Sequence, residues 1–340
     1  MRELRPLKPF EELYKSPRIL EFKAQSTEEW KEWKEALKEK LIELLGGFSE
    51  RVELLPEIVD KKEFEDYVRE RIVFNSAPDV SVVGYLLIPK NISLPVPGVV
   101  ALHGHGYGKD DVVGIWEDGT ERTIPDGYHK DFGISLVKAG FITFAIEQAC
   151  FGERREPEDI AVSKYQSSCR KVSFWAMLLG KTVLGMRVWD VIRAIDYLQT
   201  RNEVKKDSIG VMGISGGGMT TLFSSAIDER VKAVVVSGYL NTFRASILSI
   251  HHCECNYVPG ILKYAEMSDV ASLIAPRALL IESGTKDDIF PIKATEFSIS
   301  KVKKVYELLQ ATDKLESDIF EGRHQISGRK AYGWLKEQLK

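Results

Sequence analysis

The sequence has no long apolar run, since none of its hydrophobic stretches approaches the roughly 18 residues that cross a bilayer. Its first residues, MRELRPLKPFEELYK, are charged from the start and lack the apolar core of a signal peptide. The formal net charge of −3 offers no general attraction to a polyanion. We therefore expect a soluble cytoplasmic protein that binds neither nucleic acid nor a membrane.

Cysteine is scarce, with only Cys150, Cys169, Cys253 and Cys255 among 340 residues. The segment His251-His252-Cys253-x-Cys255 is dense enough in ligand types to suggest a metal cluster. However, C-x-C lacks the C-x₂₋₄-C spacing of structural zinc sites, and no second ligand pair follows at a suitable distance. We expect no metal and no cofactor, and interpret the cysteines as buried free thiols in a reducing compartment.

Short β-branched or apolar runs dominate the chain from about residue 70 onward. Eight of them are candidate strands, at Arg71–Asn75, Ser81–Ile88, Val96–Leu102, Phe141–Ile146, Ser208–Ile214, Val231–Ser237, Ala278–Ser283 and Leu315–Glu321. The later runs are continuously apolar, as in parallel strands buried on both faces. Amphipathic helical stripes lie between them, for example from Leu184 to Leu198. The alternation predicts an α/β fold with a mostly parallel sheet flanked by helices.

Residues 1–69 are charged and predict a helical N-terminal extension packed on the main domain, which spans 70–340. The four residues Ser26 to Glu29 form a possible capping box, and Gly46-Gly47 is a plausible stop. The apolar stripe that begins at Trp30 is most simply a packing face, although a partner-binding helix is the alternative. Three long connections, near 104–130, 148–181 and 239–266, have the character of lids or binding loops.

The eight residues GISGGGMT, Gly213 to Thr220, admit two incompatible interpretations. As G-x-x-x-x-G they resemble a phosphate-binding P-loop, but Met219 stands where that loop needs a lysine to neutralise phosphate charge. As G-x-S-x-G they match the nucleophile turn of a serine hydrolase, centred on Ser215.

The neighbouring residues favour the nucleophile turn. A predicted strand ends at Ile214 and a predicted helix begins at Gly216, so Ser215 lies on a tight strand-to-helix turn that exposes its hydroxyl. Flanking glycines relieve the crowding of such a turn. The N–H of Gly216 then opens the helix and points to where an oxyanion would form.

A serine hydroxyl needs a base, and His324 is the one histidine of six that lies beyond the last predicted strand. The orienting acid is expected after the strand ALLIESG, where Asp287 and Asp288 are adjacent. We favour Asp287 and keep Asp288 as the alternative. A second oxyanion donor is expected after the third strand, where the N–H of His105 follows the flexible Gly104.

Together these segments resemble the α/β-hydrolase superfamily, and more closely its dienelactone hydrolase and acetyl xylan esterase-like branch. The resemblance covers roughly 70–340 and rests on His103–Gly106, Leu184–Leu198, Gly213–Gly218, Gly284–Pro291 and His324. It implies an eight-stranded sheet with an antiparallel first strand, no metal or organic cofactor, and ester hydrolysis. Position by position it implies Ser215 as nucleophile, Asp287 as acid and His324 as base, with oxyanion N–H groups from Gly216 and His105.

One departure bears on the substrate, because dienelactone hydrolases use a cysteine nucleophile and this chain has serine. We therefore expect a serine carboxylesterase that acts on a small ester with a short, acetyl-type acyl group. Four loop aromatics are candidates for the pocket wall, namely Trp116, Tyr128, Trp175 and Tyr257. The alternatives are a serine peptidase of prolyl-oligopeptidase type, an acyltransferase or perhydrolase, and a non-catalytic binding protein on a hydrolase scaffold.

Overall fold

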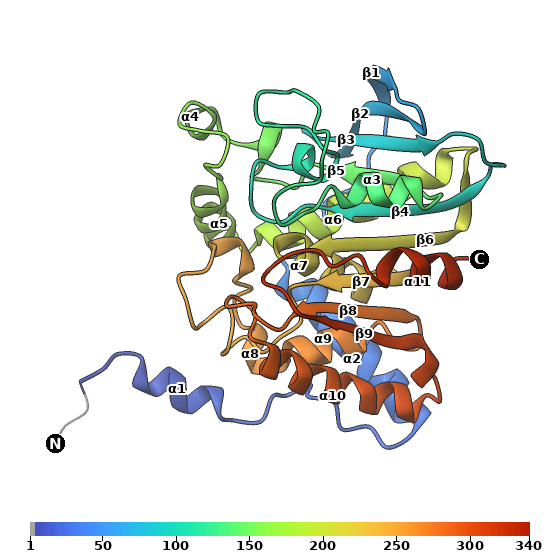
Figure 1. Ribbon diagram of the computed structural model, residues 1–340. Coiled ribbons are helices and arrows are strands. Elements are labelled where there is room, and N and C mark those ends of the chain that lie inside the picture. The colour runs from blue at the N-terminus through green and yellow to red at the C-terminus, as the bar shows by residue number, and fades with distance from the viewer. Residues whose placement is uncertain (1–3) are drawn as a thin grey trace.

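The computed structural model describes residues 4–340, which form one sheet of nine strands flanked by helices (Figure 1). The strand order is β1-β2-β3-β5-β4-β6-β7-β8-β9. Strands β4 to β9 pair in parallel, whereas β1, β2 and β3 run antiparallel to their neighbours. The strands are β1 Glu57–Glu63, β2 Tyr67–Ala77, β3 Val80–Pro89, β4 Val96–Leu102, β5 Ile142–Ile146, β6 Val204–Ile214, β7 Val231–Ser237, β8 Ala278–Gly284 and β9 Leu315–Phe320.

All eight expected strands are present, and the sheet has a ninth strand that the sequence did not indicate. This strand, β1, reads EIVDKKE and is exposed at every position. It carries no hydrophobic pattern because only its backbone pairs with β2. The expectation of a helical segment over 1–69 is therefore wrong for β1 and for the start of β2 at Tyr67.

Helices cover both faces of the sheet and create two apolar cores. Alternate residues of β4 point to opposite sides, so Val100 and Leu102 join one core while Val99 and Ala101 join the other. Helices α2, α6, α7, α9 and α10 cover the first face, and α3 and α11 cover the second. In the described chain no helix is long and apolar enough to cross a membrane.

The helices, including four short 3₁₀ turns (η), are α1 Lys8–Tyr14, α2 Thr27–Leu44, η1 Lys109–Val112, α3 Phe132–Lys138, η2 Gly152–Arg154, α4 Pro157–Ile160, α5 Cys169–Leu178, α6 Val183–Thr200, α7 Gly216–Ile227, η3 Glu254–Asn256, α8 Ile261–Tyr264, α9 Met267–Ser272, α10 Ile292–Leu308, η4 Thr312–Lys314 and α11 Ala331–Gln338.

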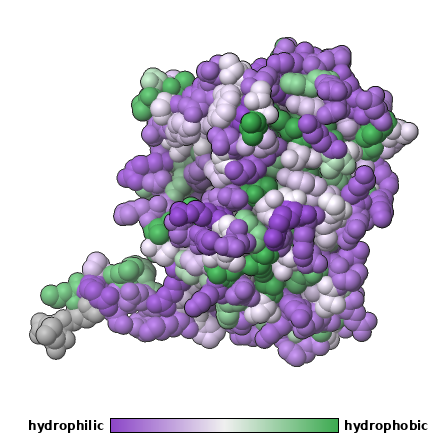
Figure 2. Space-filling view, viewed as in Figure 1, coloured by the Kyte–Doolittle hydropathy of each residue, from purple (hydrophilic) through white to green (hydrophobic). Residues whose placement is uncertain are grey.

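The N-terminal extension consists of one packed helix and one protruding helix. In α2 the Ser26 hydroxyl accepts the Glu29 amide at 3.1 Å, as the capping pattern predicts, and Trp30 is buried. None of the residues of α1 is buried, and it extends away from the body with hydrophobic side chains on its surface (Figures 1 and 2). Its end is attached by the Tyr14 hydroxyl, which donates to Glu266 at 2.9 Å, and by Arg18, 3.1 Å from the same carboxylate.

The strand order reverses direction at β4, which lies between β5 and β6. At such a point the connections leave the sheet on opposite sides, and a crevice opens between them at the carboxyl ends of the strands. Ligands of open α/β sheets bind in this crevice. The three long connections gather at this end of the sheet (Figure 1). Each contains short helices of its own, among them η1, α5 and η3. The residues that follow β4 and β6 therefore lie where this fold is expected to bind a ligand.

A buried charge cluster supports the connection after β4. Glu147, which directly follows β5, accepts the backbone N–H of Lys109 at 2.9 Å and lies 3.3 Å from its ammonium group. Both side chains are only 1% exposed. Burial alone would raise the pKa of Glu147, but the Lys109 charge and hydrogen bonds from His103 and the Lys109 amide lower it to about 2. The carboxylate therefore stays charged and holds the loop by its backbone.

Helix α7 begins so close to β4 that a side chain is excluded at Gly217. A Cβ atom added there would lie 1.9 Å from the Leu102 carbonyl oxygen and 2.6 Å from that of His103. Both clashes are with backbone atoms, which have no rotamer to change. Glycine at this position lets the first turn of α7 reach the end of β4.

We expect Gly217→Ala to lower the free energy of unfolding by about 3 kcal/mol, because α7 must move away from the sheet. Gly333→Ala is the matched control, since a Cβ there has nothing within 4 Å. That change should stabilise α11 by about 0.5–1 kcal/mol. Urea unfolding of both variants measures the difference. Equal stabilities would contradict the close approach.

Replacement of Glu147 by glutamine should cost about 3 kcal/mol near neutral pH, because it removes the fully buried carboxylate beside Lys109. The more exposed Asp110 and Glu153 then remain, at 3.1 and 2.6 Å from the ammonium group. The folded pKa of Glu147 is about 2, against an ordinary value of 4.5. Its stabilising effect is therefore complete above about pH 4.5 and is lost as the pH falls toward 2.

Urea unfolding at several pH values tests this expectation, and the gap between wild type and variant should narrow on acidification. The control is Glu153→Gln, which also removes a carboxylate from Lys109, at 2.6 Å, but from a side chain that is 48% exposed. Its cost should be below about 1 kcal/mol. A Glu147→Gln variant as stable as this control would contradict the role of the buried pair.

Candidate active site

Ser215 lies at the sharp turn between β6 and α7 that the sequence predicts. Its backbone has φ 58° and ψ −122°, a region that non-glycine residues rarely occupy. Its amide donates to the Ser237 carbonyl at 3.0 Å, which fixes the turn against the end of β7. Backbone strain of this kind persists only where the surrounding structure enforces it, and it concentrates at functional sites.

His324 follows β9 and is paired with Asp287, which follows β8. The His324 Nδ1 lies 2.7 Å from the Asp287 Oδ2. The other carboxylate oxygen accepts the amides of Ile289 and Phe290, each at 2.9 Å, so the carboxylate cannot rotate freely. Asp288 is exposed on the same loop. Of the two candidate acids, the structure brings only Asp287 to the imidazole.

The His324 ring is held between two aromatic rings. The Tyr128 centroid lies 5.4 Å and the Phe290 centroid 5.6 Å from that of His324, both in stacked orientation. A Cβ at Gly238 would lie 3.0 Å from the imidazole Cε1, so glycine leaves room for the ring. Within residues 4–340 the buried His324 Nε2 has no hydrogen-bond partner. With Nδ1 donating to Asp287, this nitrogen carries a free lone pair.

The loop that carries His324 is secured by a carboxylate that sequence analysis missed. Glu282 accepts the amides of Ser327 and Gly328 at 2.7 and 3.0 Å, and its pKa is raised by burial. A signal was available, since a charged residue interrupts the otherwise neutral strand ALLIESG. Such a residue in a strand buried on both faces needs a specific partner.

The backbones of His105 and Gly216 lie close together beside Ser215. A Cβ built at Gly216 would lie 4.0 Å from the His105 backbone nitrogen. Neither amide has a hydrogen-bond acceptor within the described chain. Gly216 is the first residue of α7, where unpaired N–H groups and the helix dipole favour negative charge. The pair is suited to bind a developing oxyanion.

A second aspartate–histidine pair positions this loop, and sequence analysis gave it no role. The Gly104 amide donates to the His129 Nε2 at 2.8 Å, and the His129 Nδ1 lies 2.7 Å from Asp111. Burial lowers the pKa of His129, which keeps its ring neutral and able to accept the amide. The Tyr128 hydroxyl donates to the His105 carbonyl at 2.6 Å. Both contacts hold the backbone that leads to the His105 amide.

These groups open into one cavity of about 380 Å³. It is lined by His105, Tyr128, Ser215, Ile250, His251, His252, Cys253, Ile289 and His324. Of the four loop aromatics expected in the wall, only Tyr128 is among these residues. Trp116 instead packs against Arg122, Trp175 is 67% exposed on α5, and the Tyr257 hydroxyl donates to the Ile247 carbonyl at 3.2 Å.

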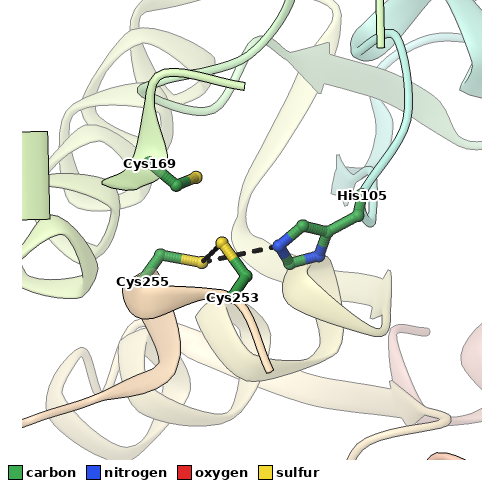
Figure 3. A group of neighbouring side chains, drawn as sticks. All are labelled: His105, Cys169, Cys253 and Cys255. Carbon is green, nitrogen blue, oxygen red and sulfur yellow. Dashed lines mark hydrogen bonds between the residues drawn. The ribbon is translucent and has the colours of Figure 1, made fainter. Parts of the chain in front are cut away.

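The cysteine-rich segment forms one side of this cavity. His105, Cys169, Cys253 and Cys255 each offer one possible ligand atom, and the four atoms lie within 4.8 Å of one another (Figure 3). His251 and His252, the histidines next to these cysteines in sequence, are not part of the group. The residues with the chemistry to hold a metal thus come from three separate loops.

Comparison with known proteins agrees with this architecture. The protein described as "Putative hydrolase YtaP" from Bacillus subtilis is 28% identical over 282 residues, which is 81% of this chain and 89% of that protein. Among solved structures, a "putative acetyl xylan esterase" from Bacteroides fragilis has a TM-score of 0.80 at 19% identity, covering 100% of this chain and 91% of that one.

A glucuronoyl esterase from Solibacter usitatus has a TM-score of 0.70 at 15% identity, covering 95% of this chain and 97% of that one. At such identities these structures share the α/β-hydrolase fold with this chain. The model of the Abhydrolase family matches residues 13–325. The chain therefore belongs to the Abhydrolase family.

Proposed function

We propose that this protein is a serine hydrolase that cleaves carboxylic esters through an acyl-enzyme. One observation carries the proposal: Ser215 and the unpaired Nε2 of His324 line the same cavity, and Asp287 holds the far side of that imidazole. A nucleophile, a base and an orienting acid in this relation make up the constellation of acyl-transfer enzymes. The order Ser215, Asp287, His324 along the chain is that of the α/β-hydrolases.

In the first step the Ser215 Oγ attacks the ester carbonyl while its proton passes to the His324 Nε2. Asp287 keeps the imidazole in the tautomer with hydrogen on Nδ1 and stabilises the imidazolium that forms. The carbonyl oxygen becomes an oxyanion, which accepts hydrogen bonds from the amides of Gly216 and His105. Each such donor contributes about 3–4 kcal/mol to the stability of the transition state.

The tetrahedral intermediate then collapses, and the C–O bond to the alcohol breaks. The imidazolium returns its proton to the departing alkoxide, which leaves as the neutral alcohol. Water attacks the acyl-enzyme in the second half of the reaction, and its proton passes to the His324 Nε2. Release of the acid restores the Ser215 hydroxyl and the free imidazole.

The cavity supports a small acyl group such as acetyl. Its volume of about 380 Å³ lies near the lower end of the range for small-molecule sites. Ile250 and Ile289 supply apolar wall, which suits an acyl methyl group. Similarity to proteins described as an acetyl xylan esterase and a glucuronoyl esterase supports an ester substrate. The four free cysteines support a reducing, cytoplasmic location.

Ser215→Ala should reduce kcat for p-nitrophenyl acetate by about 10⁶-fold, because the nucleophile is lost. Asp287→Asn should reduce it by about 10⁴-fold, because the amide favours the wrong imidazole tautomer. Asp288→Asn is the matched control on the same loop and should leave kcat unchanged. Steady-state kinetics of the three variants test the assignment. Activity in Ser215→Ala equal to wild type would refute the mechanism.

A series of p-nitrophenyl esters from acetyl to octanoyl tests the size of the acyl pocket. We expect kcat/KM to fall by about tenfold or more once the acyl chain exceeds the cavity, since excess methylene groups cannot be buried without displacing its walls. The rate of Ser215→Ala with each ester supplies the background. A higher kcat/KM for the octanoyl ester than for the acetyl ester would contradict a small pocket.

A further inference from the structure

The side chains of His105, Cys169, Cys253 and Cys255 converge on one point beside the active-site cavity (Figure 3). His105 belongs to the connection after β4, Cys169 is the first residue of α5, and Cys253 and Cys255 flank the start of η3. We propose that these four side chains bind one Zn²⁺ ion in a tetrahedral Cys₃His site. The site ties together the three long connections that surround the cavity, and it reverses the sequence-based expectation of no metal.

The distances are close to those of a zinc tetrahedron. With Zn–S of about 2.3 Å and Zn–N of about 2.0 Å, the edges of such a tetrahedron are about 3.8 Å between sulfurs and about 3.5 Å between sulfur and nitrogen. The Cys255 Sγ lies 3.6 Å from the His105 Nε2 and 3.3 Å from the Cys253 Sγ. The widest separation in the group is within 4.8 Å, so bound zinc requires a movement of about 1 Å.

A buried cation next to the cluster provides independent support. Arg187 on α6 is 1% exposed, and its Nη2 lies 3.3 Å from the Cys169 Sγ. Its Nε and Nη2 both donate to the Ala149 carbonyl, while its Nη1 is buried without a hydrogen-bond partner. In the described part of the chain, the hydrogen-bond partners of this guanidinium are the Ala149 carbonyl and the Cys169 sulfur, and neither is a carboxylate. A buried arginine without an anion is costly.

Zinc binding would supply the missing negative charge. Three thiolates and one Zn²⁺ ion sum to a net charge of −1, which matches the single positive charge of Arg187. Three neutral thiols and one neutral imidazole would leave the charge of Arg187 uncompensated. Asn256, also buried, places its Nδ2 3.5 Å from the Cys255 Sγ, as an amide that donates to a ligating sulfur does.

The geometry assigns the ion a structural role. Four protein ligands complete the tetrahedron and leave no open position for water or substrate. The ion would hold the His105 ring by Nε2, and the backbone nitrogen of the same residue lies 4.0 Å from the position of a Cβ at Gly216, beside the candidate oxyanion site. This last consequence rests on the proposed function, whereas zinc binding itself does not.

Elemental analysis of the purified full-length protein tests the site without reference to activity. We expect one zinc per chain in wild type and in Ser215→Ala, and a loss of most of the metal in Cys169→Ser and Cys255→Ser. Cys150→Ser is the matched control, because Cys150 is a buried cysteine of the same region that is not in the ligand group. It should retain the full stoichiometry. Wild type without stoichiometric metal, or ligand variants that keep it, would overturn the proposal.

A measurement on the wild-type chain covers the case in which the ligand variants fail to fold. Protein stripped with a chelator and shown by circular dichroism to be folded is titrated with Co²⁺. A tetrahedral Cys₃His site gives intense thiolate-to-cobalt absorption and visible d–d bands, with saturation at one equivalent. No such spectrum, or a Cys253–Cys255 disulfide detected by mass spectrometry in the freshly purified protein, would refute zinc binding.

The same stripped protein separates the two proposals. We expect loss of zinc to reduce kcat for p-nitrophenyl acetate by about 10²-fold, the effect of disturbing one oxyanion donor, with a smaller change in KM. Addition of zinc should restore the rate. A chain that binds one zinc but hydrolyses no ester would contradict the proposed function and leave the metal site standing.

Discussion

The close contact between the start of α7 and the end of β4 is the constraint on which the site depends. The Leu102 carbonyl leaves no space for a side chain at Gly217, and the turn before it forces Ser215 into a backbone conformation that serine rarely adopts. Because the helix cannot move away without losing this packing, the serine is held at its end. The strand order reverses at β4, so this end of the helix faces the crevice between two sets of connections.

Two aspartate–histidine pairs lie near Ser215. They differ in whether the second ring nitrogen of the histidine has a hydrogen-bond partner, and this difference identifies the candidate base. In the pair of Asp111 and His129, the second ring nitrogen already accepts a hydrogen bond from the Gly104 amide, so this pair supports the loop. In the pair of Asp287 and His324, the second nitrogen has no partner within residues 4–340. Only a nitrogen with a free lone pair can take a proton. Similar local geometry thus gives one structural histidine and one candidate base.

Sequence analysis predicted the features that depend on residues close to one another in the sequence. Continuous apolar runs indicated eight strands, and glycines around Ser215 indicated the turn, because both patterns record burial or crowding within a few residues. Strand β1 was missed because it is exposed at every position and its two apolar residues, Ile58 and Val59, are adjacent and do not alternate with polar ones; it is held by its pairing with β2. The choice between Asp287 and Asp288 depended on which carboxylate the loop turns inward, and adjacent identical residues carry no signal of that.

Tertiary contacts account for the remaining differences. Spacing rules apply to ligands that are close in sequence, so they did not indicate the four-residue cluster, in which His105 and Cys169 meet Cys253 and Cys255 only after folding. The support from Glu147 was likewise invisible, since its partner Lys109 belongs to another connection. Burial patterns therefore predicted the scaffold well, but not the long-range polar contacts that set the shape of the cavity.

The N-terminal extension is attached to a residue that lies far along the chain. Glu266 receives Tyr14 and Arg18 on one carboxylate oxygen and the Phe243 amide on the other. Phe243 lies in the connection that also carries two of the cluster cysteines. The N-terminal extension and the connection after β7 thus share a single carboxylate. A boundary drawn at the first strand would therefore remove the two side chains that bind Glu266, and leave this buried carboxylate with backbone amides, among them that of Phe243.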